Sequence, residues 1–154
     1  MTAPVQEAID VRTSSTTRPR LGFLGVGWIG RHRMHAIAES GAATVAAVAD
    51  ASPEMAREAC SGLDTRPEVS GCLDELLDHD LDGIVIATPS ALHAEQAIAA
   101  LERGVAVFCQ KPLARTVDET RRVVEAARAA DRLLGVDLSY RHTAAMCAIR
   151  DLVT

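Results

Sequence analysis

The sequence predicts an α/β protein built on a doubly wound parallel sheet. From Leu21 onward, short apolar or β-branched runs alternate with longer segments of helical period, which is the pattern of repeated βαβ units. Hydrophobic residues make up 48% of the 154 residues and aromatic residues only 3%, so Ala, Val, Leu and Ile must fill the core. This composition is typical of helices packed on a parallel sheet, and the length suits one domain.

The expected strands follow from the apolar runs. The first, at 20–26, leads into a cluster of glycines, and the second, at 43–50, ends in Asp50. The remaining located strands are 81–89, 105–109 and 133–140. Pro112 prevents the fourth of these runs from continuing as a central strand. We expect six strands in all, of which the apolar runs locate five.

Helix boundaries follow from capping residues. The first helix opens at the glycines and ends at Gly41. Ser52 is a candidate N-cap before Pro53, and Thr116 with Glu119 forms a capping box. The other expected helices are 72–80, 90–104 with Ser90 as its N-cap and Gly104 as its stop, 116–130 and 144–153.

Composition and charge predict where the protein is located and exclude some classes of partner. Residues 1–20 are expected to form a disordered leader, and residues 21–154 to form the folded domain. The chain has no apolar signal segment and no membrane-length run, so we expect a cytoplasmic protein without a membrane partner. Its net charge of -5, without a dense Lys/Arg cluster, argues against nucleic acid. The four cysteines are widely spaced, and no metal site is expected.

The stretch GFLGVGWIGRHRMHA, residues 22–36, has glycine spacing typical of a dinucleotide-binding turn. Gly25 would permit the tight turn, Gly27 would let the backbone approach a pyrophosphate, and Gly30 would let the helix pack closely on the strand. Amides at the helix start would face the phosphates. The alternative is a glycine turn in an α/β protein that binds another ligand.

Asp50 follows the next strand, close to the offset expected for an acidic ribose contact in a Rossmann-like fold. Its carboxylate would accept hydrogen bonds from the adenosine ribose and repel a 2′-phosphate, and no Arg immediately follows it. The residue therefore favours NAD over NADP as cofactor. A helix-capping or solvated carboxylate is the alternative interpretation.

The stretch DGIVIATPSALHAEQAIAALERGVAVFCQKPLARTVDET, residues 82–120, resembles the Gfo/Idh/MocA family of oxidoreductases, and the resemblance covers about residues 20 to 154. It implies that Thr88 and Pro89 lie beside the nicotinamide half of the cofactor and that His93 matches a family histidine. The family's Glu-Lys-Pro corresponds to Gln110, Lys111 and Pro112. The expected cofactor contacts are Gly25, Gly27, Trp28, Ile29, Gly30, Asp50, Thr88, Pro89, His93, Gln110 and Lys111.

Lys111 is the candidate catalytic residue. In the family this lysine lies near the nicotinamide and the substrate hydroxyl. A lysine at the carboxyl end of a parallel strand faces the crevice where such sheets bind ligands, where its ammonium could hydrogen-bond a reacting oxygen. Without the resemblance, a surface lysine is the simpler interpretation. For His93, on an apolar helix, a packed histidine is the alternative to a ligand contact.

Two departures from the family pattern bear on function. Gln110 replaces the family's glutamate, so a carboxylate expected near Lys111 is missing. The family's second, α+β domain, with its Asp and His for proton transfer, is not expected within these 154 residues.

We therefore expect the cofactor domain of a truncated or split NAD-dependent oxidoreductase that transfers hydride between nicotinamide and a sugar, polyol or related hydroxy compound. It should be inactive as the isolated chain. A stand-alone dinucleotide-binding or sensing module is the alternative. The apolar face of the last helix favours self-association into a homo-oligomer.

Overall fold

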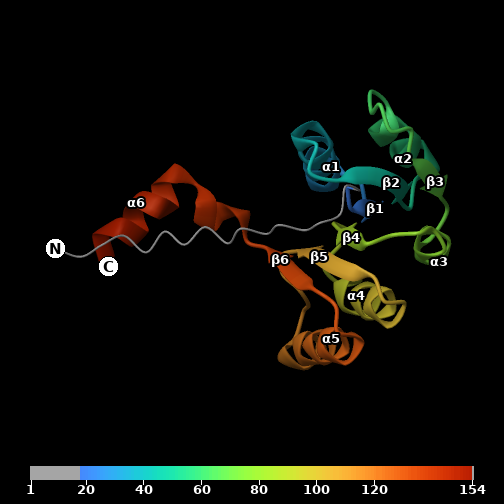
Figure 1. Ribbon diagram of the computed structural model, residues 1–154. Helices are drawn as coiled ribbons and strands as arrows, with labels where there is room; N and C mark the ends of the chain where they lie inside the picture. Colours follow the sequence, from blue (N-terminus) through green and yellow to red (C-terminus); the bar gives the residue numbers. More distant parts are fainter. Residues whose placement is uncertain (1–17, 154) are drawn as a thin grey trace.

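The computed structural model describes residues 18–153, which form one six-stranded parallel sheet with helices on both faces (Figure 1). In chain order the elements are β1 (Arg20–Leu24), α1 (Trp28–Ser40), β2 (Thr44–Ala49), α2 (Pro53–Cys60), β3 (Glu68–Ser70), α3 (Leu73–Leu77), β4 (Gly83–Ile86), α4 (His93–Glu102), β5 (Ala106–Gln110), α5 (Val117–Ala130), β6 (Leu134–Asp137), a 3₁₀ helix (Ser139–His142) and α6 (Ala144–Val153). The expected leader, residues 1–20, lies almost wholly outside the described residues.

The strand order is β3-β2-β1-β4-β5-β6, and every neighbouring pair is parallel. This order confirms the predicted doubly wound, Rossmann-like fold. The order reverses between β1 and β4, where the crossover connections leave toward opposite sides. Open α/β sheets bind ligands at the carboxyl ends of the strands beside such a reversal.

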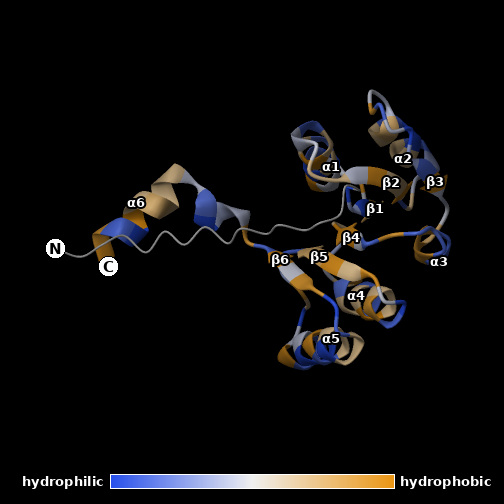
Figure 2. Cartoon of the chain, in the orientation of Figure 1, coloured by the Kyte–Doolittle hydropathy of each residue, from blue (hydrophilic) through white to orange (hydrophobic). Residues whose placement is uncertain are grey.

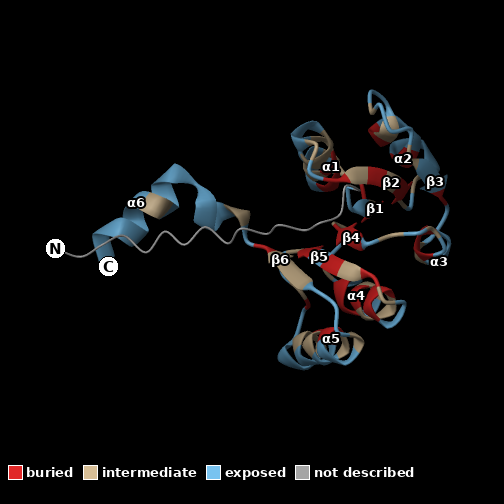
Figure 3. Ribbon diagram, in the orientation of Figure 1, coloured by how far each residue is buried: buried red, intermediate tan, exposed pale blue. Residues whose placement is uncertain are grey.

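Two apolar clusters fix the helices to the two faces of the sheet (Figure 3). On one face, α1 and α2 contribute Met34, Ala56 and Ala59 against Phe23 of β1 and Val48 of β2. On the other face, small and branched side chains of α3, α4 and α5 pack on β4 and β5. The core therefore consists mainly of Ala, Val, Leu and Ile, as the composition predicts.

Several local expectations are confirmed. The Ser52 hydroxyl accepts a hydrogen bond from the amide of Met55 at 3.3 Å, which caps α2. The Thr116 hydroxyl likewise accepts from the amide of Glu119 at 3.1 Å and caps α5. Gly41, with φ of 65°, ends α1 in the left-handed conformation that an L residue rarely adopts.

Other expectations are wrong in detail. The short strand β3 is missed by the sequence reasoning because two of its three residues are exposed and no apolar run marks it. Ser90 does not cap α4: the helix begins at His93, since the amide of Leu92 bonds to Pro89 and forms a turn first. The expected strand at 133–140 ends at Asp137, and a 3₁₀ turn follows.

Helix α6 stands apart from the sheet, and Figures 1 and 2 show its apolar residues away from either helical layer. None of its described residues is buried. Its exposed apolar side chains are Met146, Ile149, Leu152 and Val153. Within the described chain this face has no cover, as the sequence predicts, and self-association through it remains a prediction. No helix in residues 18–153 has the length and apolarity to span a bilayer.

Candidate cofactor site

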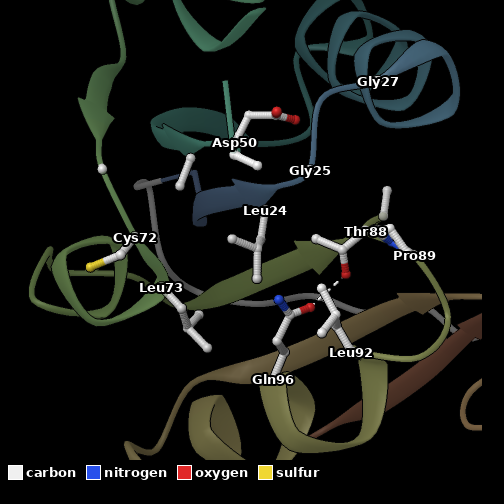
Figure 4. A pocket seen from close by; sticks show the side chains of 14 residues that line it. Leu24, Gly25, Gly27, Asp50, Cys72, Leu73, Thr88, Pro89, Leu92 and Gln96 are labelled. Carbon is white, nitrogen blue, oxygen red and sulfur yellow. Dashed lines mark hydrogen bonds between the residues drawn. The ribbon is translucent and has the colours of Figure 1, made fainter. Parts of the chain in front are cut away.

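A pocket of about 490 Å³, here called the strand-end pocket, opens at the carboxyl ends of β1, β2 and β4 (Figure 4). It lies at the reversal of strand order, where the fold predicts a ligand. The pocket is lined by Leu24, Gly25, Gly27, Ala49, Asp50, Ala51, Gly71, Cys72, Leu73, Ala87, Thr88, Pro89, Leu92 and Gln96. It therefore contains five of the expected contact positions, Gly25, Gly27, Asp50, Thr88 and Pro89.

The three glycines of the motif differ in what a side chain at each position would meet. Gly25 has φ of +82°, and a Cβ there would lie 2.8 Å from backbone atoms of Ala87 and Thr88. A Cβ on Gly30 would collide with the carbonyl oxygen of Gly25. A Cβ on Gly27, in contrast, would meet no heavy atom within 4 Å. Gly25 and Gly30 thus serve the chain's own packing, whereas Gly27 leaves open space on the pocket wall.

The N-terminus of α1 faces this space without a side-chain cap. Gly27 is its N-cap residue, no side chain accepts from the first amides, and the first turn has no acidic residue. The first amides of a helix lack partners within the helix, and the helix dipole gives this end positive character. An anion is therefore the ligand that this end of the pocket favours.

Asp50 lies at the end of β2 and is fixed by two backbone amides. Its Oδ2 accepts from the amide of Val26 at 2.8 Å, and its Oδ1 accepts from Ser52 at 3.0 Å. Because Ser52 itself caps α2, Asp50 is not the cap of that helix. Each carboxylate oxygen keeps a further acceptor site, so the half-buried group can hold the glycine turn and also accept ligand hydroxyls.

These features fit an NAD molecule. The open space beside Gly27 suits a pyrophosphate, and the oriented Asp50 carboxylate suits a ribose diol. No Lys or Arg is among the described residues that line the strand-end pocket, so no cation there would offset repulsion between Asp50 and a 2′-phosphate.

The other end of the strand-end pocket contains residues that the sequence reasoning missed. The Thr88 hydroxyl donates to Oε1 of Gln96 at 2.5 Å, and this bond fixes both side chains on the pocket wall (Figure 4). Gln96 directly follows Glu95 in a helix that also contains His93, so its polarity alone does not single it out in the sequence. Leu92 and Leu73 add apolar walls.

His93 lies beneath the pocket and not on its wall. The side chain is 1% exposed, with Nδ1 2.7 Å from the carbonyl oxygen of Pro112 and Nε2 2.8 Å from that of Thr88. Both ring nitrogens are thus engaged by backbone, which differs from the expected cofactor contact and matches the packed alternative. His93 ties the loop after β4 to the loop after β5, and so fixes Thr88 relative to Lys111.

Four more of the predicted residues, Trp28, Ile29, Gln110 and Lys111, meet in a second cavity of about 250 Å³, here called the Lys111 pocket, whereas Gly30 is buried and lines neither cavity. It is lined by Trp28, Ile29, His32, Arg33, Gln110, Lys111, Ser139 and Tyr140. Lys111 is exposed at the end of β5, and its amide donates to Oε1 of Gln110 at 2.7 Å. Apart from Gly30 and His93, the expected contact residues divide between two pockets that adjoin at the start of α1, where Gly27 lines one and Trp28 the other.

Two cysteines provide a test of the strand-end pocket. Burial raises the pKa of the Cys109 thiol to about 12, so at pH 8 this residue is almost entirely protonated and unreactive. Cys72 is exposed and lines the pocket. We expect a thiol reagent to label Cys72 in the folded chain while Cys109 reacts only on unfolding, and NADH to slow the labelling of Cys72. Peptide mapping by mass spectrometry gives both rates, and equal labelling of Cys72 with and without saturating NADH would contradict the placement.

Comparison with known proteins agrees with this geometry. The model of the GFO_IDH_MocA oxidoreductase family, NAD-binding Rossmann fold, matches residues 19–138. Inositol 2-dehydrogenase 3 of Saccharopolyspora erythraea is 34% identical over 136 residues, which are 87% of this chain and 40% of that protein. Levoglucosan dehydrogenase of Pseudarthrobacter phenanthrenivorans is 36% identical over 106 residues, 69% of this chain and 27% of that protein.

Among solved structures, the WlbA dehydrogenase of Bordetella pertussis in complex with NADH and UDP-GlcNAcA superposes with a TM-score of 0.83 at 29% identity, over 90% of this chain and 40% of that one. This chain thus spans about 40% or less of the length of these relatives. The family match contains every residue that lines the strand-end pocket and six of the eight that line the Lys111 pocket, since Ser139 and Tyr140 lie beyond it. The chain belongs to the GFO_IDH_MocA family of oxidoreductases with an NAD-binding Rossmann fold.

Proposed function

We propose that the strand-end pocket and the Lys111 pocket together bind one NAD(H) molecule in an extended form. The pyrophosphate lies beside Gly27 at the start of α1, and the adenosine ribose bonds to Asp50. The nicotinamide end passes Thr88 and Pro89 toward Lys111. The observation that carries this proposal is the open space at Gly27, since the other two motif glycines are explained by packing within the chain.

The chemistry proposed for this site is hydride transfer to or from a sugar, polyol or related hydroxy compound. Bound NAD(H) supplies the hydride acceptor or donor. Lys111 directly follows β5 at the cavity wall, where its ammonium is placed to donate a hydrogen bond to the reacting oxygen. The curated relatives act, by their names, on inositol and levoglucosan, and these hydroxy compounds support this substrate class.

Further residues are needed for the whole reaction, and we propose that residues 21–154 form the cofactor domain, which acts in the cytoplasm together with a second, substrate-binding domain. The exposed apolar face of α6 supports an interface with such a domain or with a second copy of the chain. The alternative function, a dinucleotide-binding module without catalysis, is separated from this one by the turnover assay described in the Discussion.

The proposed preference for NAD is tested by Asp50→Asn. The amide keeps the shape of the side chain, but it loses the charge and one acceptor, so we expect about a tenfold loss of NADH affinity. NADPH affinity should fall less or rise, because the repulsion of the 2′-phosphate is removed. Calorimetric titration of both cofactors measures the change in their ratio.

Asp64→Ala, at an exposed acid outside both pockets, is the matched control and should leave both affinities unchanged. An unaltered ratio of NADH to NADPH affinity in Asp50→Asn would contradict the assigned role of Asp50.

A further inference from the structure

Asp137 is the one buried acidic residue in the part of the chain that the structure describes, and neither the glycine motif nor the family pattern accounts for it. It is 5% exposed, at the last position of β6. Its register partner on the neighbouring strand is Gln110, the residue directly before Lys111. A buried carboxylate is costly unless it is paired and hydrogen-bonded, so its partners indicate what it holds in place.

Two side chains and one backbone amide donate hydrogen bonds to the Asp137 carboxylate. Nε of Arg33 donates to Oδ2 at 2.5 Å, and Nε2 of Gln110 is 3.4 Å from the same oxygen. The amide of Ser139 donates to Oδ1 at 3.1 Å. Arg33 also donates through Nη2 to the Ser139 hydroxyl at 2.8 Å, which closes the cluster.

All three partners line the Lys111 pocket. Arg33 comes from α1, six residues after Gly27, while Gln110 ends β5 and Ser139 begins the 3₁₀ turn. Gln110 uses its amide oxygen to accept from the amide of Lys111 at 2.7 Å, and so extends the cluster to the candidate catalytic residue. Asp137 therefore joins the cofactor helix and the loops that follow β5 and β6 around one cavity.

The cluster also accounts for the glutamine at 110. With Asp137 beside it, a glutamate at 110 would place two carboxylates at one site, whereas the glutamine amide donates to Asp137 and its oxygen accepts from Lys111. The carboxylate expected one residue before Lys111 is thus supplied from the neighbouring strand. The Asp137 carboxylate forms an ion pair with Arg33. Lys111, which also lines the cavity, makes no ion pair with any described residue.

We propose that Asp137 is a positioning residue for the nicotinamide end of the cofactor, acting through Arg33, Gln110 and Ser139 in place of an acid at position 110. This inference rests on the proposed NAD(H) site. It predicts that Asp137 matters for the part of the ligand that enters the Lys111 pocket and not for the part held by Gly27 and Asp50.

The experiment compares NADH with ADP-ribose, which lacks the nicotinamide, by calorimetric titration of the 154-residue chain. Asp137→Asn should weaken NADH binding about tenfold and change ADP-ribose binding less than about twofold. Gln110→Glu should cause a similar selective loss, because it places a second carboxylate beside Asp137. The double variant restores one acid and one amide, and it should recover NADH affinity to within about threefold of the unmodified chain.

Asp131→Asn, at an exposed acid that ends α5, is the matched control, and thermal unfolding of each variant measures its stability. Three results would overturn the role of Asp137. Asp137→Asn could lose equal affinity for NADH and ADP-ribose, or it could bind NADH as the unmodified chain does. The third is a double variant whose loss of NADH affinity equals the sum of the losses in the two single variants. If the unmodified chain binds neither ligand, the proposed cofactor site itself is wrong, which is a different result from the loss of selectivity.

Discussion

Gly27→Val should remove NAD(H) binding and leave the domain folded. The valine side chain would occupy the space where the pyrophosphate approaches the first amides of α1, and the loss of several charge-assisted hydrogen bonds predicts a decrease in affinity of at least about 100-fold. The fold should tolerate the change, because a Cβ at this position meets no heavy atom within 4 Å and φ is -59°, which any L residue adopts.

Gly30→Ala is the contrasting variant. Its Cβ would collide with the Gly25 carbonyl, so α1 must move away from the strand end, and the melting temperature should fall. Calorimetry with NADH and thermal unfolding by circular dichroism measure the two properties for each variant. If Gly27→Val is folded and binds NADH as the unmodified chain does, the pyrophosphate does not lie at the start of α1.

The 154 residues by themselves should show no measurable dehydrogenase turnover, although they bind the cofactor. Oxidation of an alcohol requires a base for the hydroxyl proton and contacts that hold the carbinol carbon against the nicotinamide. Positioning of this kind accounts for roughly 7–11 kcal/mol of the barrier, or about five to eight orders of magnitude in rate. Of the described residues that line this cavity, Lys111 is the one that we assign to contact with the reacting oxygen, and it cannot supply both functions.

A panel of inositols, sugars and anhydrosugars with NAD, followed by absorbance of the reduced cofactor, measures turnover directly. The turnover rate of the unmodified chain should not exceed that of Lys111→Ala under the same conditions. Robust turnover that Lys111→Ala abolishes would show that these residues hold the full catalytic site, and the need for a second domain would be refuted.

Most of the features that the sequence predicts correctly depend on residues that are close together in the chain. Gly30 is restricted by the carbonyl oxygen of Gly25 five residues earlier, and Ser52 caps a helix through an amide three residues away, so these roles are visible in short stretches. Strand β3 is missed because it has only three residues and two of them are exposed. Ser90 fails as a cap because a turn closes first, and that turn depends on the backbone bond between Leu92 and Pro89.

Partners distant in the chain set the parts that the sequence does not predict. His93 contacts carbonyl oxygens 5 and 19 residues away, which makes it part of the scaffold below the pocket. Asp137 pairs with Arg33 across 104 residues and with Gln110 across 27, and only the register of β5 and β6 brings these groups together. No spacing rule within one segment indicates such a cluster.

The pocket at the start of α1 is proposed to bind NAD(H), with Asp50 on the adenosine ribose. Calorimetric titration of the unmodified 154-residue chain with NADH and then with NADPH tests it most directly. We expect one NADH bound per chain, at least about tenfold more tightly than NADPH, because the Asp50 carboxylate accepts from ribose hydroxyls and repels a 2′-phosphate. Tighter binding of NADPH, or no binding of either cofactor, would show that Asp50 does not hold the ribose of NAD(H) in this pocket.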